Sequence, residues 1–435
     1  MRANRLKSLT GKGVLYAAIV LGTLVLADLV MNLLGVFPPT YDYGDPVAGW
    51  VAARPTGHMH DSECTEYSTG ERVAYTRNED GARTSVSSRR LQQDSRVFKI
   101  AVSGDSQTLL CAPNELTHFG VLEHELSSAG RETLAFDYGA GKYSPLQAYL
   151  AVRRLILAYS ADAFVLNFYT GNDLYDMLRV DDRPHFVREG AGYVIADPIW
   201  YQQDPPGVVR RSRILYAFRA IGNRTGLRNV LVRLRYLHAI AAEQGKGLLS
   251  VAEYMNDLRK SASSEVGYPA AFAAQMLNQQ LFFHRFPGSR EETIRRVRAL
   301  LELVRREHPK MLLVLSALPS YQLVQRQPVD ASFLRVFERL PITYAGGVSE
   351  EGALYDTLRT LAAETGWIFV DNLRPLREYA GGQRLYNDFD YHFLPVASAI
   401  IGHAQAQAIA PYLRAPGVAS SADAGANRSG RVERR

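Results

Sequence analysis

The feature that most constrains the fold is a regular alternation of strand-like and helix-like segments from residue 96 onward. Short, largely apolar runs at 97–102, 133–138 and 163–169 predict strands, and the longer segments 115–128 and 145–159 between them predict helices. Parallel strands need a crossover between them, and a helix commonly supplies it. The alternation therefore predicts a parallel sheet with helices on both faces.

The same alternation returns in the second half of the chain. Helices are predicted at 291–307, 354–365 and 395–413, and strands at 311–316 and 367–370. The two halves therefore belong to one α/β architecture that is interrupted by a long insertion.

That insertion, 177–290, breaks the alternation. It begins with aromatic-rich loops and continues into the Arg-rich stretch RLRYLHAIAAEQGKG, so we expect a mostly helical cap on the sheet. A basic helix lying on a membrane surface is the alternative. The aromatic side chains of Tyr193, Trp200 and Tyr201 are candidates for stacking on sugar rings or accepting acyl chains, and core packing is an equally good interpretation.

Composition fits a folded protein rather than a disordered one. The 435 residues are 47% hydrophobic and 22% charged, and the formal charge of +6 is dispersed over many arginines. No nucleic-acid-binding motif is present, so we expect no nucleic-acid partner. The predicted organisation is 1–40, cytoplasmic N-terminus and anchor; 41–95, extension with strands; 96–176, first part of the main domain; 177–290, insertion; 291–414, second part; 415–435, disordered tail.

An apolar segment near the N-terminus predicts a membrane anchor. Residues 14–37 are interrupted only by Asp28 and Asn32, and at about 1.5 Å per residue they exceed the roughly 30 Å bilayer core. Pro38 and Pro39 would end such a helix.

The residues before this segment predict its orientation. Basic residues favour a cytoplasmic N-terminus, which places the rest of the chain in the periplasm as a single-pass inner-membrane protein. A cleaved signal peptide, for which Val25 and Ala27 offer small cleavage-site residues, and a buried core helix are the alternatives. The basic residues are Arg2, Arg5, Lys7 and Lys12.

The chain has two cysteines, Cys64 and Cys111. In an exported protein they can form a disulfide, and two unrelated buried thiols are the equally open alternative. His58, His60, Asp61 and Cys64 could be drawn as a metal site, but they lie in an expected loop without a recognisable ligand geometry, so we expect no metal.

Two predicted strands end in polar residues suited to acyl chemistry. Ligands of open parallel sheets bind beyond the carboxyl ends of the strands. The sequence GDS at 104–106 places Ser106 at a strand-to-helix turn, where its hydroxyl is exposed and its N–H is free to bind an oxyanion. The sequence GND at 171–173 places the Asn172 carboxamide at another strand end. Each motif alone is typical of an ordinary turn.

The segment DYGAGKYSP, 137–145, contains a Gly-Lys pair that invites comparison with a phosphate-binding loop. That motif requires Gly at 136 and Ser or Thr at 143, where Phe136 and Tyr143 stand. We therefore exclude it.

A candidate general base lies near the C-terminus, in NDFDYHFLP at 387–395. His392 precedes the last predicted helix, with Asp390 two residues and Asp388 four residues before it. A histidine paired with a carboxylate can take the proton of a serine hydroxyl.

Taken in order, GDS, a Gly-containing turn, GND and D-x-H near the C-terminus resemble the SGNH hydrolases, also called the GDSL family. The resemblance covers about 96–176 and 291–412. It implies a three-layer α/β/α sandwich with a flavodoxin-like sheet that hydrolyses or transfers acyl groups without a metal or cofactor.

The resemblance also implies roles for individual residues. Ser106 would be the nucleophile, Asn172 an oxyanion donor and His392 the base. Asp390 matches the triad carboxylate, with Asp388 in reserve.

Two positions depart from the family pattern. Lys142 stands where the oxyanion glycine is expected, with Gly141 one position earlier. Lys142 could supply its N–H only in a suitable conformation, and a positive φ is costly for a residue other than glycine. Gln107 replaces the apolar or aromatic residue that often follows GDS.

Together these observations predict an exported, membrane-anchored serine esterase or O-acyltransferase of SGNH type. Its expected substrates are acyl esters, foremost the O-acetyl groups of cell-envelope polysaccharides. A lipid esterase is the first alternative, and a non-catalytic scaffold that binds glycan or protein on the same fold is the second.

Overall fold

The structure is a computed structural model that describes residues 43–45, 48–51, 55–65, 71–178, 183–190, 192–196, 287–325, 347–387 and 391–413, together with a few helical residues between 16 and 30. Over these residues, no helix is both long enough and apolar enough to cross a membrane. Most of the predicted anchor at 14–37 and all of the predicted tail at 415–435 lie outside the described residues.

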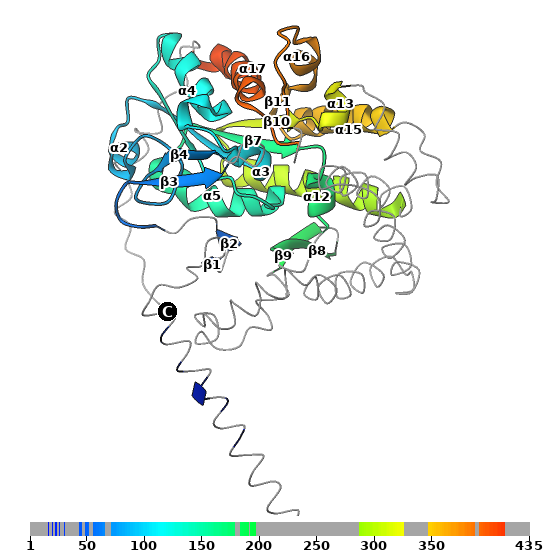
Figure 1. Cartoon of the computed structure of the whole chain (residues 1–435). Coiled ribbons are helices and arrows are strands. Elements are labelled where there is room, and N and C mark those ends of the chain that lie inside the picture. The colour runs from blue at the N-terminus through cyan, green and yellow to red at the C-terminus, as the bar shows by residue number, and fades with distance from the viewer. Residues whose placement is uncertain are drawn as a thin grey trace, which may run out of the picture.

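The centre of the fold is a five-stranded parallel sheet (Figure 1). Its strand order is β11-β10-β7-β5-β6, so by chain position the order is 2-1-3-4-5, the flavodoxin-like arrangement. All five predicted strands are present, and the predicted α/β class with a flavodoxin-like parallel sheet is confirmed. The strands are β5 (Phe98–Ser103), β6 (Thr133–Asp137), β7 (Ala163–Tyr169), β10 (Leu312–Leu318) and β11 (Ile368–Asp371).

Helices cover both faces of this sheet, as predicted. One face packs against α4 (His118–Ser128) and α17 (Pro395–Leu413), and the other against α5 (Pro145–Tyr159), α12 (Pro287–Glu307) and α15 (Gly347–Glu364). The molecule therefore has three layers, α/β/α. The shorter helices are α2 (Ser88–Gln93), α3 (Ser106–Leu109), η1 (Asn114–Leu116), α6 (Asp173–Asp176), α13 (Tyr321–Gln325) and α16 (Leu373–Glu378).

Side-chain alternation along β5 explains how one strand serves both faces. Phe98, Ile100 and Val102 belong to the apolar cluster with α4 and α17, whereas Ala101 belongs to the cluster on the opposite side. Successive residues of a strand point to opposite faces, so an all-apolar strand is buried on both sides.

The extension before the sheet contains strands, as predicted. They form two antiparallel hairpins, β1 (Tyr43–Asp45) with β2 (Gly49–Val51) and β3 (His60–Thr65) with β4 (Arg72–Arg77). After β4, Arg83 exchanges two backbone hydrogen bonds with Asp137 at the end of β6, with N···O distances of 2.8 and 2.9 Å. The extension is thereby attached to the edge of the central sheet.

The described part of the insertion is 177–178, 183–190, 192–196 and 287–290, and the rest of the predicted mostly helical segment lies outside the described residues. The described part contains an antiparallel hairpin of β8 (His185–Glu189) and β9 (Gly192–Ala196), and α12 begins at Pro287 rather than at 291. The hairpin escaped prediction because its strands are short and partly exposed. All of 197–286 lies outside the described residues, including Trp200 and Tyr201.

Of the two interpretations offered for Tyr193, the structure supports packing within the protein. Its hydroxyl donates to Glu292 at 2.9 Å, and its ring contacts Phe186 edge to face at 5.9 Å between centroids. These contacts join the hairpin to α12.

A buried polar network lies between the sheet and the helices α4 and α17. The Asn167 carboxamide donates to Nε2 of His118 at 2.8 Å, and Gln405 donates to Asn167 and to Ser316. Burial, and secondly the charge of Arg83, lower the pKa of His118 to about 3. The imidazole is therefore a neutral acceptor in the folded protein.

This neutral histidine makes the protein sensitive to acid. An unfolded His118 binds a proton below pH about 6.5, whereas the folded one does so only near its lowered pKa, so stability is lost as pH falls through this window. We expect His118→Gln, which keeps an acceptor for Asn167 and has no titrating ring, to lose about 2.5 kcal/mol less stability than the wild type between pH 7 and pH 4.5. Urea unfolding at the two pH values measures this difference, and equal losses in the two proteins would contradict the assignment.

Candidate active site

The first predicted site residue, Ser106, lies at a strand-to-helix turn, as expected from the sequence. β5 ends at Ser103 and α3 begins at Ser106, capped by the Asp105 carboxylate, which accepts from the N–H of Gln107 at 2.9 Å. Gly104 is required in this turn, because a Cβ there would lie 2.2 Å from Oγ1 of Thr108. As the first helical residue, Ser106 has a backbone N–H that makes no bond within the helix.

The loop after β6 lies beside Ser106. The N–H of Ala140 donates to the carbonyl oxygen of Gly104 at 3.2 Å, and a Cβ built on Gly141 would lie 3.8 Å from Cβ of Ser106. Lys142 follows with a φ of 70°. Lys142 thus adopts the left-handed conformation that glycine adopts without strain. In this conformation its backbone N–H can stand where the N–H of the expected glycine would be.

The conformation of Lys142 carries a measurable cost. We expect Lys142→Gly to raise the free energy of unfolding by about 0.5–1 kcal/mol, because the relief of left-handed strain exceeds the entropy that glycine adds to the unfolded chain. Lys142→Val is expected to lower it by about 1 kcal/mol, since β-branched residues tolerate this conformation worst. Urea titrations measure both.

A control for the Lys142 variants is Ser160→Gly. Ser160 has a φ of 52° at the end of α5, so the same gain is expected there. A loss of stability in Lys142→Gly beside a gain in Ser160→Gly would show that the Lys142 side chain makes a contact worth more than the strain.

Asn172 follows β7 and stands at the N-terminus of α6, next to the Asp105–Ser106 turn. Its Nδ2 donates to the Asp176 carboxylate at 3.1 Å, and its side chain lies close enough to Asp105 to lower the pKa of that carboxyl against the rise caused by burial. Asp176 in turn forms an ion pair with Arg183 at 2.7 Å, and both side chains are almost fully buried. The carboxamide is therefore positioned by a buried ion pair behind it.

Three buried carboxylates gather around this turn: Asp105, Asp173 and Asp176. Burial raises the pKa of Asp105 to about 6, against the hydrogen bond from Gln107 and the charge of His392. Burial also raises the pKa of Asp173, and Asp105 and Asp176 raise it further because like charges repel. The buried carboxyls Asp105 and Asp173 are therefore harder to ionise than solvent-exposed ones.

His392 lies in the loop before α17, held by a small backbone ladder. The N–H of Asn387 donates to the carbonyl oxygen of His392 at 2.8 Å, and the N–H of Leu394 to that of Leu385 at 2.9 Å. The side chain of Gln107, the residue after Ser106, hydrogen-bonds to the backbone on both sides of His392. The candidate triad acids Asp390 and Asp388 lie outside the described residues.

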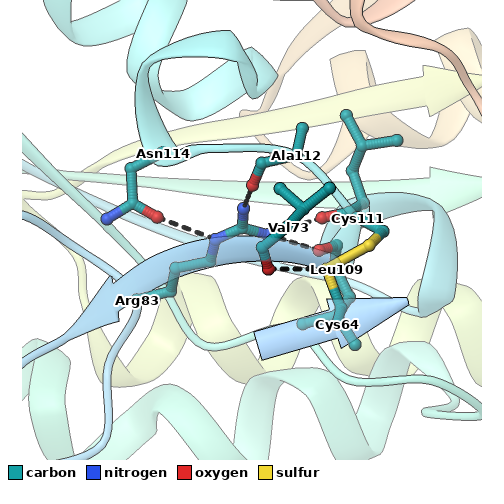
Figure 2. The surroundings of a disulfide bond; sticks show 8 residues. Cys64, Val73, Arg83, Leu109, Cys111, Ala112 and Asn114 are labelled. Atoms are coloured by element: carbon teal, nitrogen blue, oxygen red, sulfur yellow. Dashed lines mark hydrogen bonds between the residues drawn. A yellow bond between two sulfur atoms is a disulfide. The ribbon is translucent and has the colours of Figure 1, made fainter. Parts of the chain in front are cut away.

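Cys64 and Cys111 form a disulfide, which decides between the two alternatives left open by the sequence (Figure 2). The bond joins β3 to the loop that follows α3. Because its sulfur is oxidised, Cys64 is not a metal ligand in the imagined cluster with His58, His60 and Asp61. In the part of the chain that the structure describes, there is no group of three or more side chains suited to hold a metal ion.

The same loop is bound from its other side by Arg83 (Figure 2). This fully buried guanidinium donates to the Asn114 side chain at 2.9 Å, to the carbonyl oxygen of Leu110 at 2.7 Å, and to those of Leu109 and Ala112. Burial lowers the pKa of Arg83 to about 10, which leaves it charged. The segment directly after the candidate nucleophile is thus fixed by an arginine and a disulfide.

Sequence reasoning missed the supporting residues Arg83, Asp176 and Arg183. A buried arginine has the same local signature as an exposed one, since its partners come from distant parts of the chain. The one available signal was Gln107, a polar residue at a position where apolar ones are common.

No family model and no curated protein matches this chain. Solved structures similar to it include a lipase/acylhydrolase from Enterococcus faecalis, with 10% identity and a TM-score of 0.33 over 73% of this chain and 97% of that one. Another is Axe2, an acetylxylan esterase from Geobacillus stearothermophilus, with 12% identity and a TM-score of 0.32 over 73% and 96%. Because these scores are low, the fold assignment rests on the strand order.

Proposed function

We propose that the chain is a serine-dependent acyl ester hydrolase or O-acyltransferase of SGNH type. The observation that carries the proposal is the convergence of three distant segments on residues 105–107 at the switch point of the sheet. Gly141 packs beside Ser106, the Asn172 side chain lies close enough to Asp105 to lower the pKa of that carboxyl against the rise caused by burial, and the His392 loop is hydrogen-bonded to Gln107. Ligands of doubly wound sheets bind at this point.

The chemistry follows from the residue types. His392 takes the proton of the Ser106 hydroxyl as Oγ attacks the acyl carbonyl, and Asp390 or Asp388 stabilises the imidazolium. The N–H groups of Ser106 and of Gly141 or Lys142, with the Asn172 carboxamide, bind the oxyanion. The leaving alcohol receives the proton from His392, and an acyl ester remains on Ser106.

The second half of the reaction restores the enzyme. Water or a sugar hydroxyl loses its proton to His392 and attacks the acyl-Ser106 carbonyl. The Ser106 ester bond then breaks, and His392 returns the proton to Oγ of Ser106. Water gives hydrolysis, and a sugar gives O-acyl transfer.

We place the protein at the inner membrane, anchored through 14–37 with its main domain in the periplasm. The disulfide supports export, because cytosolic thiols are normally kept reduced. In that compartment, O-acetyl groups on cell-envelope polysaccharides are the proposed substrates.

The experiment is ester hydrolysis by the full chain in detergent, beside Ser106→Ala. We expect Ser106-dependent hydrolysis of p-nitrophenyl acetate that is faster than hydrolysis of the decanoate. A preference for the decanoate would favour the lipid esterase. If the folded protein shows no Ser106-dependent turnover, either with or without an added glycan acceptor, the non-catalytic scaffold that binds glycan or protein is the remaining function.

A further inference from the structure

The Gln107 side chain makes two hydrogen bonds to the backbone of the loop that contains His392. Its Nε2 donates to the carbonyl oxygen of Tyr391 at 3.2 Å, and its Oε1 accepts from the N–H of Phe393 at 3.0 Å. These two backbone groups stand directly before and directly after His392. The side chain is 1% exposed, so water does not compete for either bond.

The chemistry of the partners fixes the orientation of the carboxamide. A carbonyl oxygen only accepts and a backbone N–H only donates, so the amide nitrogen must face Tyr391 and the amide oxygen must face Phe393. In an extended chain the C=O of one residue and the N–H two residues later lie on the same edge. The planar carboxamide of Gln107 offers one donor and one acceptor to these two backbone groups, as the backbone of a paired β-strand would.

The His392 loop needs this support. Tyr391 has a φ of 57°, a left-handed conformation that is strained for a bulky L-residue. Its ring packs on Tyr321 with 4.5 Å between centroids, and its N–H donates to Asn387 at 3.0 Å. The two bonds of Gln107 add to these contacts and tie the loop to the residue next to Ser106.

We infer that Gln107 is a positioning residue that sets the imidazole of His392 against the hydroxyl of Ser106 by binding the peptide groups on both sides of the histidine. The inference rests on the proposed function. It explains why a polar residue stands at 107, since an apolar side chain could make neither bond.

The test compares Gln107→Leu with Gln107→Glu in the full chain. Leucine loses both bonds, whereas an ionised glutamate keeps the acceptor for Phe393 but has no donor for Tyr391. For p-nitrophenyl acetate we expect kcat to fall about 10- to 100-fold in Gln107→Leu and less in Gln107→Glu, with KM within about threefold, because misplacing a catalytic group affects the transition state rather than substrate binding.

The matched control is Gln147→Leu. Gln147 is another fully buried glutamine, and its Nε2 donates to the carbonyl oxygen of Ala48 at 2.8 Å. Its loss is expected to lower stability comparably while kcat stays within about twofold, since a lost buried hydrogen bond away from the site affects only the fold. A folded Gln107→Leu or Gln107→Glu variant with the kcat of Gln147→Leu would overturn the inference.

A second readout separates this inference from the proposed function. Amide hydrogen exchange of Phe393 is expected to be at least about tenfold faster in Gln107→Leu than in Gln147→Leu, because only the former removes its acceptor. If the wild type shows no Ser106-dependent turnover, the proposed function fails and exchange alone decides. Unchanged exchange would overturn the positioning role.

Discussion

Ser106→Ala and His392→Ala are each expected to lower kcat for p-nitrophenyl acetate by at least about 10³-fold. In the proposed mechanism the serine provides the nucleophile, and without the histidine its hydroxyl would keep its proton and attack poorly. The Asn172 and backbone donors remain in both variants, so some residual catalysis is expected.

The double variant provides the sharper form of this prediction. Two residues that act as one unit lose their function together, so Ser106→Ala with His392→Ala is expected to be about as slow as either single variant. Steady-state rates of the three variants and the wild type give the comparison. Effects that multiply in the double variant would show that the two residues act independently, and the proposed proton transfer would then be wrong.

Removing the disulfide is expected to have the largest effect on stability. The bond between Cys64 and Cys111 closes a loop with a sequence separation of 47. Constraining a loop of that length in the unfolded chain contributes about 4 kcal/mol by the chain-entropy estimate. We therefore expect Cys64→Ser with Cys111→Ser to unfold in urea with about that much less stability than the oxidised wild type.

The same experiment separates stability from catalysis. Arg83 still binds the carbonyl groups of Leu109, Leu110 and Ala112 in the double-serine variant, so kcat is expected to stay within about threefold of the wild type while the protein is folded. The reduced wild type is expected to match the variant in stability. Equal stability of oxidised and reduced wild type would contradict the predicted contribution.

Prediction from the sequence succeeded where local pattern decides structure. The bounds of α5, β7 and α17 agree with the predicted segments, because long apolar periodicity, a serine cap and Pro145 or Pro395 mark them locally. The position of Ser106 followed from the same reasoning, since a buried strand followed by a capped helix leaves little freedom for the turn.

Contacts between distant segments could not be predicted in this way. The partners of Gln107 are 284 and 286 residues away along the chain. Arg183, which lies two residues before β8 in the insertion, forms a buried ion pair with Asp176. Such pairings depend on how the elements pack, and the residue types alone are equally compatible with solvent exposure.

Lys142 lies between these two cases. The sequence could state the condition, a positive φ at a residue other than glycine, and the structure meets it with 70°. The reason is tertiary: the loop must pass close to Ser106, and Gly139 and Gly104 allow that approach.

The most direct test of the central claim is active-site labelling of the full chain with a fluorophosphonate, followed by digestion and peptide mass spectrometry. An activated serine displaces fluoride and forms a stable phosphonate ester. We predict a single adduct on Ser106 that is absent in Ser106→Ala and forms much more slowly in His392→Ala. A folded wild type that carries no adduct, or carries it on another residue, would contradict the account.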